Sequence, residues 1–189
     1  MILLYYTAVP QHGEPDLSQL PPQIAERIAG RPKANRRQSA AAWQLLVRAL
    51  GECGLDMRTI SLHFSENGRP SLPSHPHLTF SLTHTDTLAA IALCNNGDMI
   101  GLDAEPIEET ARTARIAARF FTQAEKESGQ PPTLIWTRKE ALLKSLDLTA
   151  LPDTAHTDAH FTTFIRDGHY LTLCTAKQQD ITLIPIRTP

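Results

Sequence analysis

Short apolar runs, several of them alternating with polar residues, predict β-strands in both parts of the chain. In the first part they cover residues 2–9, 59–64, 78–83, 87–94 and 99–104. In the last part they cover residues 161–166, 169–176 and 181–186. The tetrapeptide Asn-Asn-Gly-Asp at 95–98 favours a tight turn that joins the flanking strands as a hairpin, and Asp167-Gly168 favours a second one.

Apolar residues at helical spacing predict helices between these strands. Residues 40–50, 112–121 and 133–146 have this pattern. Thr122 and Glu125 have the spacing of a capping box, which begins a further short helix. The elements together predict a mixed α+β fold.

The chain divides near Gly97 into two parts of similar make-up. We expect an N-terminal α+β half at residues 1–96 and a C-terminal α+β half at 97–189 that carries the metal-binding carboxylates. With 189 residues, of which 41% are hydrophobic and 20% charged, the chain is long enough for one large domain or two small ones. The stretch at 10–22 is rich in proline and polar residues and predicts a loop.

Charge and cysteine content narrow the class of protein. A formal net charge of −2 gives no global field that would recruit nucleic acid. The three cysteines form neither a zinc pattern nor a disulfide framework, so a cytoplasmic protein is expected. The apolar start at residues 1–9 is too short and lacks the basic residues of a signal peptide, and no run is long enough to span a membrane.

Three carboxylates carry the candidate chemistry. Asp103 and Glu105 stand two residues apart on a predicted strand, so both point to the same face, and Glu140 follows on the predicted helix 133–146. Two carboxylates on one face favour a cation between them, and Mg²⁺ is typically held by one or two carboxylates with substrate phosphates. The simpler alternatives are a solvated strand end and an ordinary helix pair of Glu140 with Lys144.

Five motifs in order connect these residues to a known family. They are Gly68-Arg-Pro70, Phe80-Ser-Leu-Thr-His-Thr85, Ile100-Gly-Leu-Asp-Ala-Glu105, Arg119-Phe-Phe-Thr-Gln-Ala-Glu125 and Trp136-Thr-Arg-Lys-Glu-Ala-Leu-Leu-Lys144. The chain resembles the 4′-phosphopantetheinyl transferases, and specifically the larger monomeric, surfactin-synthetase-activating type, over residues 68–144.

The resemblance implies a fold and a reaction. The fold would be a pseudo-dimer of two similar α+β halves with the active site in the cleft between them, in a monomeric chain. The reaction would move the 4′-phosphopantetheine arm of coenzyme A, with Mg²⁺, onto a serine of an acyl or peptidyl carrier protein, as in holo-[acyl-carrier-protein] synthases of fatty acid biosynthesis. Adenosine 3′,5′-bisphosphate would be released.

The resemblance also implies roles for the acidic residues. Asp103, Glu105 and Glu140 would hold Mg²⁺ against the pyrophosphate of coenzyme A. A serine hydroxyl needs a general base, for which Glu140 is the first choice, Glu105 the second, and metal-bound water a third. Lys144, one helical turn beyond Glu140, would stabilise developing charge.

Several polar and basic residues are implied as contacts of coenzyme A. His84 matches the family's histidine for the 3′-phosphate, and Thr83 adds a hydroxyl donor. Arg69 stands where lysine is commoner, and Lys139 belongs to the helix motif. In the basic stretch 27–48, the order of preference for a 3′-phosphate contact is Arg37, Arg36 and then Lys33. Serine at 81 and threonine at 83 replace the family's usual asparagine and serine but keep the polar character.

A carrier protein would present an acidic helix beside its serine. Arg112, Arg115 and Arg119 repeat at helical spacing and form a candidate docking surface for that helix. An ordinary solvated helix face is the alternative. Two other functions stay open: a metal-dependent phosphohydrolase of a nucleotide pyrophosphate, and a non-catalytic module that binds coenzyme A or a carrier protein. The sequence does not select the carrier protein or separate primary from secondary metabolism.

Overall fold

The structure is a computed structural model that describes residues 1–108 and 110–186. Its helices are α1 (Pro22–Ala29), α2 (Lys33–Glu52), α3 (Ala111–Phe120), α4 (Gln123–Glu127) and α5 (Pro132–Leu146). Its strands are β1 (Ile2–Ala8), β2 (His63–Phe64), β3 (Pro70–Ser71), β4 (Thr79–His84), β5 (Leu88–Cys94), β6 (Ile100–Pro106), β7 (His160–Arg166), β8 (His169–Thr175) and β9 (Ile181–Pro185). The predicted α+β class is confirmed.

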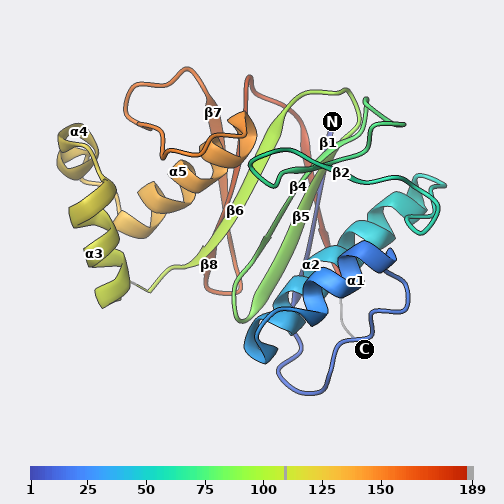
Figure 1. Ribbon diagram of the computed structural model, residues 1–189. Coiled ribbons are helices and arrows are strands. Elements are labelled where there is room, and N and C mark those ends of the chain that lie inside the picture. The colour runs from blue at the N-terminus through green and yellow to red at the C-terminus, as the bar shows by residue number, and fades with distance from the viewer. Residues whose placement is uncertain (109, 187–189) are drawn as a thin grey trace.

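Two main sheets form the centre of the molecule (Figure 1). One has the order β4-β5-β1-β9, in which β1 is antiparallel to β5 and parallel to β9. The other has the order β6-β8-β7 and is antiparallel throughout. Strand β9, from the end of the chain, therefore belongs to the same sheet as β1. That the two halves are related copies stays a prediction, as does the boundary at residue 97.

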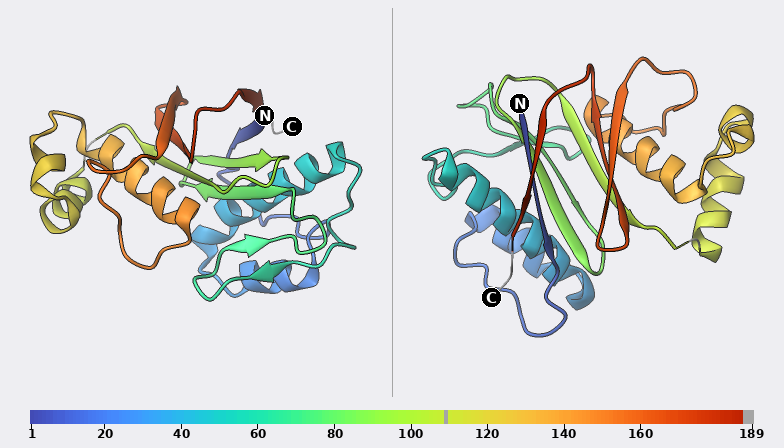
Figure 2. Two further views of the ribbon diagram at one scale, coloured as in Figure 1. Left: turned by 90° about the horizontal axis from the view of Figure 1, so that it is seen from above. Right: turned by 180° about the vertical axis from the view of Figure 1, so that it is seen from behind.

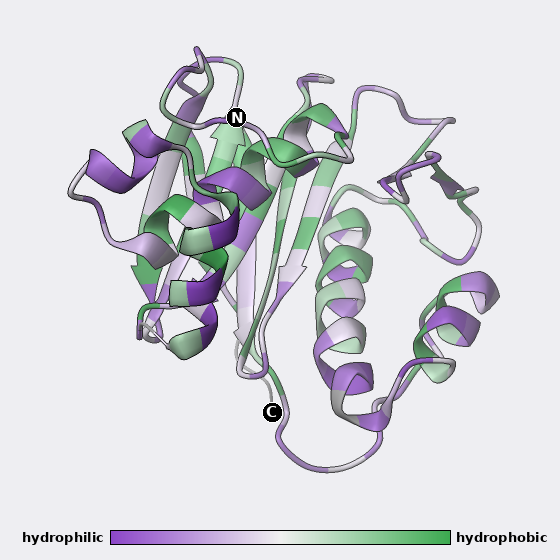
Figure 3. Ribbon diagram, turned by 60° about the vertical axis from the view of Figure 1, so that its left-hand side comes forward, coloured by the Kyte–Doolittle hydropathy of each residue, from purple (hydrophilic) through white to green (hydrophobic). Residues whose placement is uncertain are grey.

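The helices lie on the outside of these sheets (Figure 2). Helices α1 and α2 cover one face of the four-stranded sheet, whereas α5 packs against β6 and β8. Helix α3 packs against α5 on the side away from α1 and α2. Figure 3 shows hydrophobic residues gathered along the strands and hydrophilic residues common on the loops.

A hydrophobic core joins the two sheets to each other. Its buried side chains come from β1, β5, β6 and β8, and include Ile2, Leu4, Leu88, Ala90, Ile100, Leu102, Leu171 and Leu173. A second core lies between the four-stranded sheet and helices α1 and α2. Strand β5 is buried at every position because it faces both cores.

The predicted hairpin between residues 87–94 and 99–104 is wrong. Strand β5 pairs with β1 and β4, whereas β6 pairs with β8 in the other sheet. The Asn-Asn-Gly-Asp turn brings the chain from one sheet to the next, because both edges of β5 are already paired, one with β1 and the other with β4. The second predicted hairpin is confirmed: Asp167 and Gly168 both have positive φ between β7 and β8, as a type I′ turn requires.

Other differences concern helix boundaries. Helix α1 was not predicted; it begins at the last residue of the predicted loop 10–22 and ends within the basic stretch 27–48. Helix α2 begins at Lys33 rather than at residue 40. Helix α1 has Pro22 at its first position, where the fixed φ of proline suits a helix start, and Pro32 directly precedes α2. The short strand predicted at 59–64 is reduced to His63–Phe64.

Glycine at position 101 lets α5 lie unusually close to β6. A Cβ atom at Gly101 would stand 1.9 Å from the carbonyl oxygen of Ala141 and 2.5 Å from the backbone nitrogen of Ser145. Both are backbone atoms of α5, so they cannot swing aside. The missing side chain therefore sets the position of the helix that carries Glu140 and Lys144.

Among the described residues, no helix has the length and apolar character needed to cross a membrane.

Candidate active site

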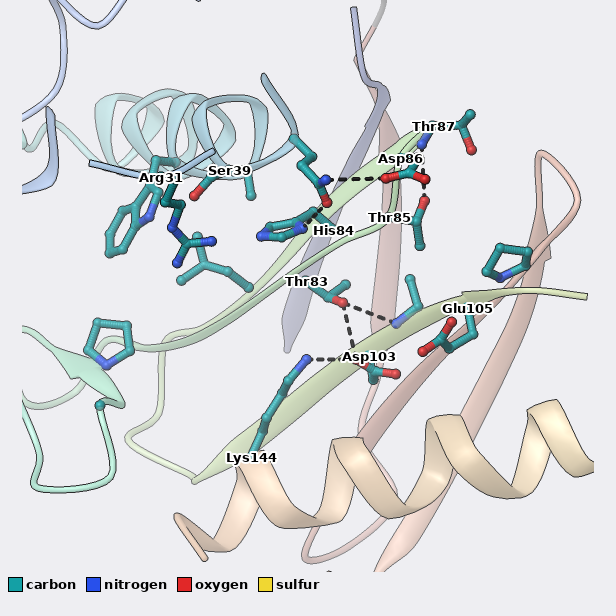
Figure 4. A pocket seen from close by; sticks show the side chains of 18 of the residues that line it. Arg31, Ser39, Thr83, His84, Thr85, Asp86, Thr87, Asp103, Glu105 and Lys144 are labelled. Carbon is teal, nitrogen blue, oxygen red and sulfur yellow. Dashed lines mark hydrogen bonds and ion pairs between the residues drawn. The ribbon is translucent and has the colours of Figure 1, made fainter. Parts of the chain in front are cut away.

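A cavity of about 770 Å³ opens between α2, the β4–β5 turn, β6 and α5 (Figure 4). Its volume is in the range of small-molecule sites. Helix α2 supplies Gln38 and Ser39, and α5 supplies Lys144. The wall between them is made by Thr83, His84, Thr85, Asp86, Thr87, Asp103, Ala104, Glu105 and Pro106. Residues from both sides of Gly97 therefore line one cavity.

Asp103 is the buried carboxylate of this cavity, with an exposed fraction of 6%. Lys144 Nζ donates to its Oδ1 at 2.7 Å, and Thr83 Oγ1 donates to the same oxygen at 3.2 Å. The other oxygen, Oδ2, is buried and has no hydrogen-bond partner in the described structure. Burial raises the pKa of Asp103, and the Lys144 ammonium only partly opposes this effect.

Glu105 lies on the same side of β6, at the mouth of the cavity. Trp136 Nε1 on α5 donates to its Oε1 at 3.0 Å, and Arg112 of α3 pairs with Oε2 at 3.2 Å. The carboxylate is thus held by a neutral donor on one side and an exposed cation on the other. Trp136 thus orients a candidate metal ligand.

Glu140 lies on α5, one turn before Lys144. In the described part of the chain, its side-chain carboxylate is not among the groups that form a side-chain hydrogen bond or an ion pair. Burial raises its pKa, and the carboxylates of Asp103 and Glu105 raise it further, whereas Lys144 and Arg112 lower it. The three predicted carboxylates therefore repel one another across the β6–α5 contact. This repulsion is what a bound cation would relieve.

The described residues do not form a ready-made cluster of three or more metal ligands. Lys144 and Arg112 occupy oxygens of Asp103 and Glu105 instead. The residues still fit a hard divalent ion, since the unpartnered Asp103 Oδ2 and the mutually repelling carboxylates are oxygen donors. Mg²⁺ usually keeps several waters and needs only one or two carboxylates with substrate phosphates.

Hydroxyl groups on β4 join the two sheets beside Asp103. Ser81 Oγ accepts the backbone N–H of Leu102 at 2.9 Å, and Thr83 Oγ1 accepts that of Ala104 at 3.1 Å. Without them, these N–H groups of β6 would be buried and unpaired. Thr83 was predicted as a ligand contact. It lines the cavity, but its hydroxyl is already engaged by Ala104 and Asp103.

His84 lines the cavity at the end of β4. Its Nδ1 lies 2.7 Å from the side-chain oxygen of Gln38. Burial lowers the pKa of His84 to about 4, and the nearby cations Arg31 and Lys144 act in the same direction. The imidazole is therefore neutral at physiological pH while the cavity holds no anion.

The arginines that line the cavity are not the ones that the sequence predicted as contacts of the 3′-phosphate. Arg27 and Arg31 line it, whereas Arg36, Arg37 and Lys33 are not among its described lining residues. Successive helical residues turn by about 100°, so a helix that faces the cavity with Gln38 and Ser39 directs its neighbours elsewhere.

Lys139 does not reach the cavity, so the predicted contact with the cofactor is not supported. Its Nζ donates to both oxygens of Glu125, at 2.7 and 2.8 Å, and to the carbonyl oxygen of Pro152 at 2.6 Å. An ammonium group has three donors, and all three are used. With an exposed fraction of 1%, Lys139 ties α5 to α4 and the loop that follows α5.

Arg69 is likewise engaged by backbone atoms and does not line the cavity in the described structure. Its guanidinium donates to the carbonyl of Lys144, to that of Ser145 at 3.1 Å and to that of Ile100 at 3.0 Å. A cation beside the last carbonyls of α5 stabilises that helix end. Arg69 thereby holds the backbone of Lys144 against the start of β6.

One end of the cavity is less polar than the other. Ala42, Trp43, Pro70 and Leu82 lie among its lining residues, together with Gly68. Trp43 packs edge-to-face with Phe64, with ring centroids 6.5 Å apart. The guanidinium of Arg27 stacks on the Phe64 ring, 4.2 Å from its centroid. The cavity thus offers an aromatic and aliphatic end and a charged end around Asp103.

Sequence reasoning missed Arg31, Gln38 and Trp43 as cavity residues. Arg31 stood within the basic stretch, and its place between Gly30 and Pro32 marks it as a link between helices. Gln38 gives no sequence signal, because a neutral amide is common in helices. Trp43 lies within the predicted helix 40–50, where it packs against the core and also lines the cavity.

The basic residues of α3 lie beyond Glu105. Arg112 pairs with Glu105, Arg119 lies 5.0 Å over the ring of Phe120, and Arg115 is exposed. Phe120 is itself exposed, with a fraction of 39%. This helix presents cations and an aromatic ring to solvent next to the charged end of the cavity.

Comparison with known proteins gives a family match that includes Asp103, Glu105, Glu140 and Lys144. Residues 99–182 match the family model described as the 4′-phosphopantetheinyl transferase superfamily. A 4′-phosphopantetheinyl transferase of Bacillus subtilis is 29% identical over 131 residues, which cover 61% of this chain and 57% of that protein. The 4′-phosphopantetheinyl transferases AcpT of Salmonella typhi and Salmonella typhimurium are 31% identical over 136 residues, which cover 67% of this chain and 66% of each relative. The matched region thus spans less than two thirds of the length of these relatives.

Proposed function

Because the chain belongs to the 4′-phosphopantetheinyl transferase superfamily, we propose that it transfers the phosphopantetheine arm of coenzyme A to a carrier-protein serine. The proposal includes Mg²⁺ dependence and release of adenosine 3′,5′-bisphosphate. The observation that carries it is the buried Asp103 carboxylate, with one unpartnered oxygen, in a cavity that also holds Lys144, Arg31 and His84. This arrangement suits a ligand that brings both phosphates and a divalent ion.

The two ends of the cavity support coenzyme A as the ligand. The apolar end around Trp43, Pro70 and Leu82 suits a purine base, which stacks on aromatic and aliphatic surfaces. Arg31 and His84 line the same cavity and would contact the phosphate on the ribose. The charged end with Asp103 and Lys144 suits the pyrophosphate.

Glu140 and Lys144 have the properties that the transfer requires. The serine oxygen forms a bond to phosphorus, the bond from that phosphorus to the bridging oxygen breaks, and the serine proton moves to a base. The side-chain carboxylate of Glu140 makes no hydrogen bond in the described structure and its pKa is raised, so it is a suitable proton acceptor. Lys144 places a positive charge one helical turn away, where it stabilises negative charge on the leaving group.

A divalent ion would be held by Asp103 and Glu105 on β6 and by Glu140 on α5. When bound there, Mg²⁺ would neutralise the pyrophosphate and fix its orientation. Lys144 pairs with Oδ1 of Asp103 and leaves Oδ2 unpartnered, whereas Arg112 pairs with Glu105. An ion bound between these carboxylates would weaken both pairs and favour a shift of the two cations toward the phosphates. Both side chains are long and partly exposed, which permits that movement.

The carrier protein would dock on α3. Arg112, Arg115 and Arg119 lie next to Glu105 and match an acidic partner helix in charge. Phe120 adds an exposed apolar contact. Both parts of one chain line the cavity, which is consistent with a monomer. A cytoplasmic holo-[acyl-carrier-protein] synthase of fatty acid biosynthesis is the form of the proposal that we favour.

The experiment is a mass spectrum of an apo acyl carrier protein after incubation with this protein, coenzyme A and Mg²⁺. We expect the carrier protein to gain the mass of one phosphopantetheine arm. This gain should be absent when EDTA is added and absent when Asp103→Ala replaces the wild type. Glu140→Gln should bind coenzyme A but transfer poorly, and Glu66→Gln on an exposed turn is the matched control.

Other outcomes would overturn the proposal. Release of adenosine bisphosphate without a mass gain, across acyl and peptidyl carrier proteins, would indicate a phosphohydrolase. Binding of coenzyme A with neither transfer nor release would indicate a non-catalytic binding module.

A further inference from the structure

Three side chains form a hydrogen-bonded series along the wall of the cavity. Gln38 Nε2 donates to Asp86 Oδ1 at 3.2 Å, and Gln38 Oε1 lies 2.7 Å from His84 Nδ1 (Figure 4). Gln38 belongs to α2, His84 to the end of β4, and Asp86 to the β4–β5 turn. The family motifs include His84 but assign no role to Gln38 or Asp86.

The direction of these hydrogen bonds follows from the chemistry of the groups. An ionised carboxylate only accepts, so the amide nitrogen of Gln38 must face Asp86 and its oxygen must face His84. A carbonyl oxygen also only accepts, so His84 Nδ1 must carry the hydrogen. The neutral ring therefore presents Nε2 as a lone pair to any ligand in the cavity.

A lone pair at Nε2 cannot donate to a phosphate oxygen. Nε2 becomes a donor only when it takes up a proton, and the empty cavity disfavours that charge. Arg31, from the link before α2, and Lys144, from α5, face the ring with positive charge, and Asp86 is the anion that opposes them. A phosphate dianion that binds between these cations would add negative charge beside the His84 ring. It would therefore raise the pKa of His84 and favour the imidazolium.

We propose that Gln38, held by Asp86, is a positioning residue that fixes the tautomer of His84 and couples phosphate binding to proton uptake at Nε2. The proton comes from solvent or from the monoanionic phosphate, and the new N–H donates to a phosphate oxygen. The ligand class is a phosphate monoester. The inference rests on the proposed function, in which that group is the 3′-phosphate of coenzyme A.

The test compares coenzyme A with dephospho-coenzyme A, which lacks the 3′-phosphate. Calorimetric titrations are run in buffers of different ionisation enthalpy, so that the number of protons taken up on binding is measured directly. Gln38→Leu should bind coenzyme A roughly tenfold more weakly, the loss typical of a hydrogen bond to a charged group, and its proton uptake should fall. Its affinity for dephospho-coenzyme A should stay unchanged.

Further variants separate positioning from folding. Gln44→Leu, on the same helix but with its amide bonded to the carbonyl of Asp16, should match the wild type with both ligands. Asp86→Ala changes an exposed side chain and should produce a smaller loss in the same direction. Gln38→Glu keeps an acceptor for Nδ1 and should retain the preference for coenzyme A.

Nitrogen-15 NMR of the imidazole rings gives a readout that a purely structural role would not move. The wild type should show His84, identified by its absence in His84→Asn, with hydrogen on Nδ1, and Gln38→Leu should show a mixed tautomer.

Two results would overturn the inference while transfer to the carrier protein persists. One is that Gln38→Leu loses affinity for coenzyme A and for dephospho-coenzyme A equally. The other is that the wild type binds coenzyme A without taking up a proton. If the wild type binds neither ligand and transfers nothing, the proposed function itself fails.

Discussion

Asp103 is buried, and burial makes ionisation of its carboxyl group energetically unfavourable. Its pKa is raised because burial outweighs the attraction of Lys144, so the folded protein binds a proton at Asp103 more tightly than the unfolded chain does. Stability therefore falls as the pH rises from the unfolded value through the raised folded value. Once ionised, the buried carboxylate destabilises the fold relative to its protonated form, which is a cost that a binding site can carry.

Asp103→Asn should consequently stabilise the protein at pH 7 while it abolishes transfer. We expect a gain of about 0.5–2 kcal/mol, with the advantage over the wild type shrinking at acidic pH. Thermal melting across pH measures this effect. Mg²⁺ should raise the melting temperature of the wild type but not of the variant. A variant less stable than the wild type at pH 7 would show that the Lys144 pair outweighs the burial of Asp103.

Lys139 and Glu125 form the opposite case, a buried pair remote from the cavity. Removal of one partner leaves an uncompensated charge, so Lys139→Met should lower the free energy of unfolding by about 3–5 kcal/mol. Affinity for coenzyme A, measured well below the melting temperature, should be retained. The exposed Lys126→Met is the control and should change stability by less than about 0.5 kcal/mol.

A tenfold loss of coenzyme A affinity in Lys139→Met, without loss of stability, would restore Lys139 to the binding site.

Single residues were predictable from the sequence to different degrees. Asp103, Lys144 and His84 lie together in the cavity because their motifs fix both residue type and spacing on an element. The partner of Lys139 was not predictable. Glu125 is on another helix, and a lysine that binds phosphate and one that binds a buried carboxylate look alike in sequence.

At the scale of elements, the contact of α5 with β6 depends on the absence of a side chain at position 101. Gly101→Ala should push α5 away from β6, because the added carbon would overlap backbone atoms of that helix. Overpacking of this kind costs about 1–3 kcal/mol. The displacement should also separate Lys144 from Asp103, so transfer should fall much more than stability does.

Gly51→Ala is the matched control, since Gly51 is helical and has nothing within 4 Å of the added carbon. That change should stabilise α2 by about 0.5–1 kcal/mol and leave transfer intact. Carrier-protein assays and denaturant unfolding of both variants measure the two effects. Full activity in Gly101→Ala would mean that α5 can shift without moving the site.

Most elements were predictable from periodicity, but their partners were not. The Asn-Asn-Gly-Asp turn has hairpin chemistry, yet β5 and β6 belong to different sheets. Local turn chemistry specifies a reversal of the chain, but it does not decide which strands pair. Strand β1 and strand β4 occupy the two edges of β5, so no edge is left for β6. Helix α1 was missed because its eight residues give too short an apolar pattern beside a proline-rich segment.

At the scale of the whole molecule, the core between the sheets should make the two parts unfold together. Buried residues of β1 and β5 pack directly on those of β6 and β8, so neither part buries its apolar surface alone. The two tryptophans report on different parts, Trp43 on α2 and Trp136 on α5. Fluorescence of Trp43→Phe and Trp136→Phe, after correction for each variant's stability by circular dichroism, should give coincident transitions. Separate midpoints would indicate two independent units.

Strand β9 has a consequence for the order in which the protein can fold during synthesis. It pairs with β1 from Ile2↔Ile181 onward, so one edge of β1 stays unpaired until residues 181–185 have been synthesised. Until then β1 presents open N–H and C=O groups beside an apolar surface, which is a template for pairing with other nascent chains. A nascent chain that lacks residues 181–185 should therefore depend more on chaperones than one in which β9 can pair with β1.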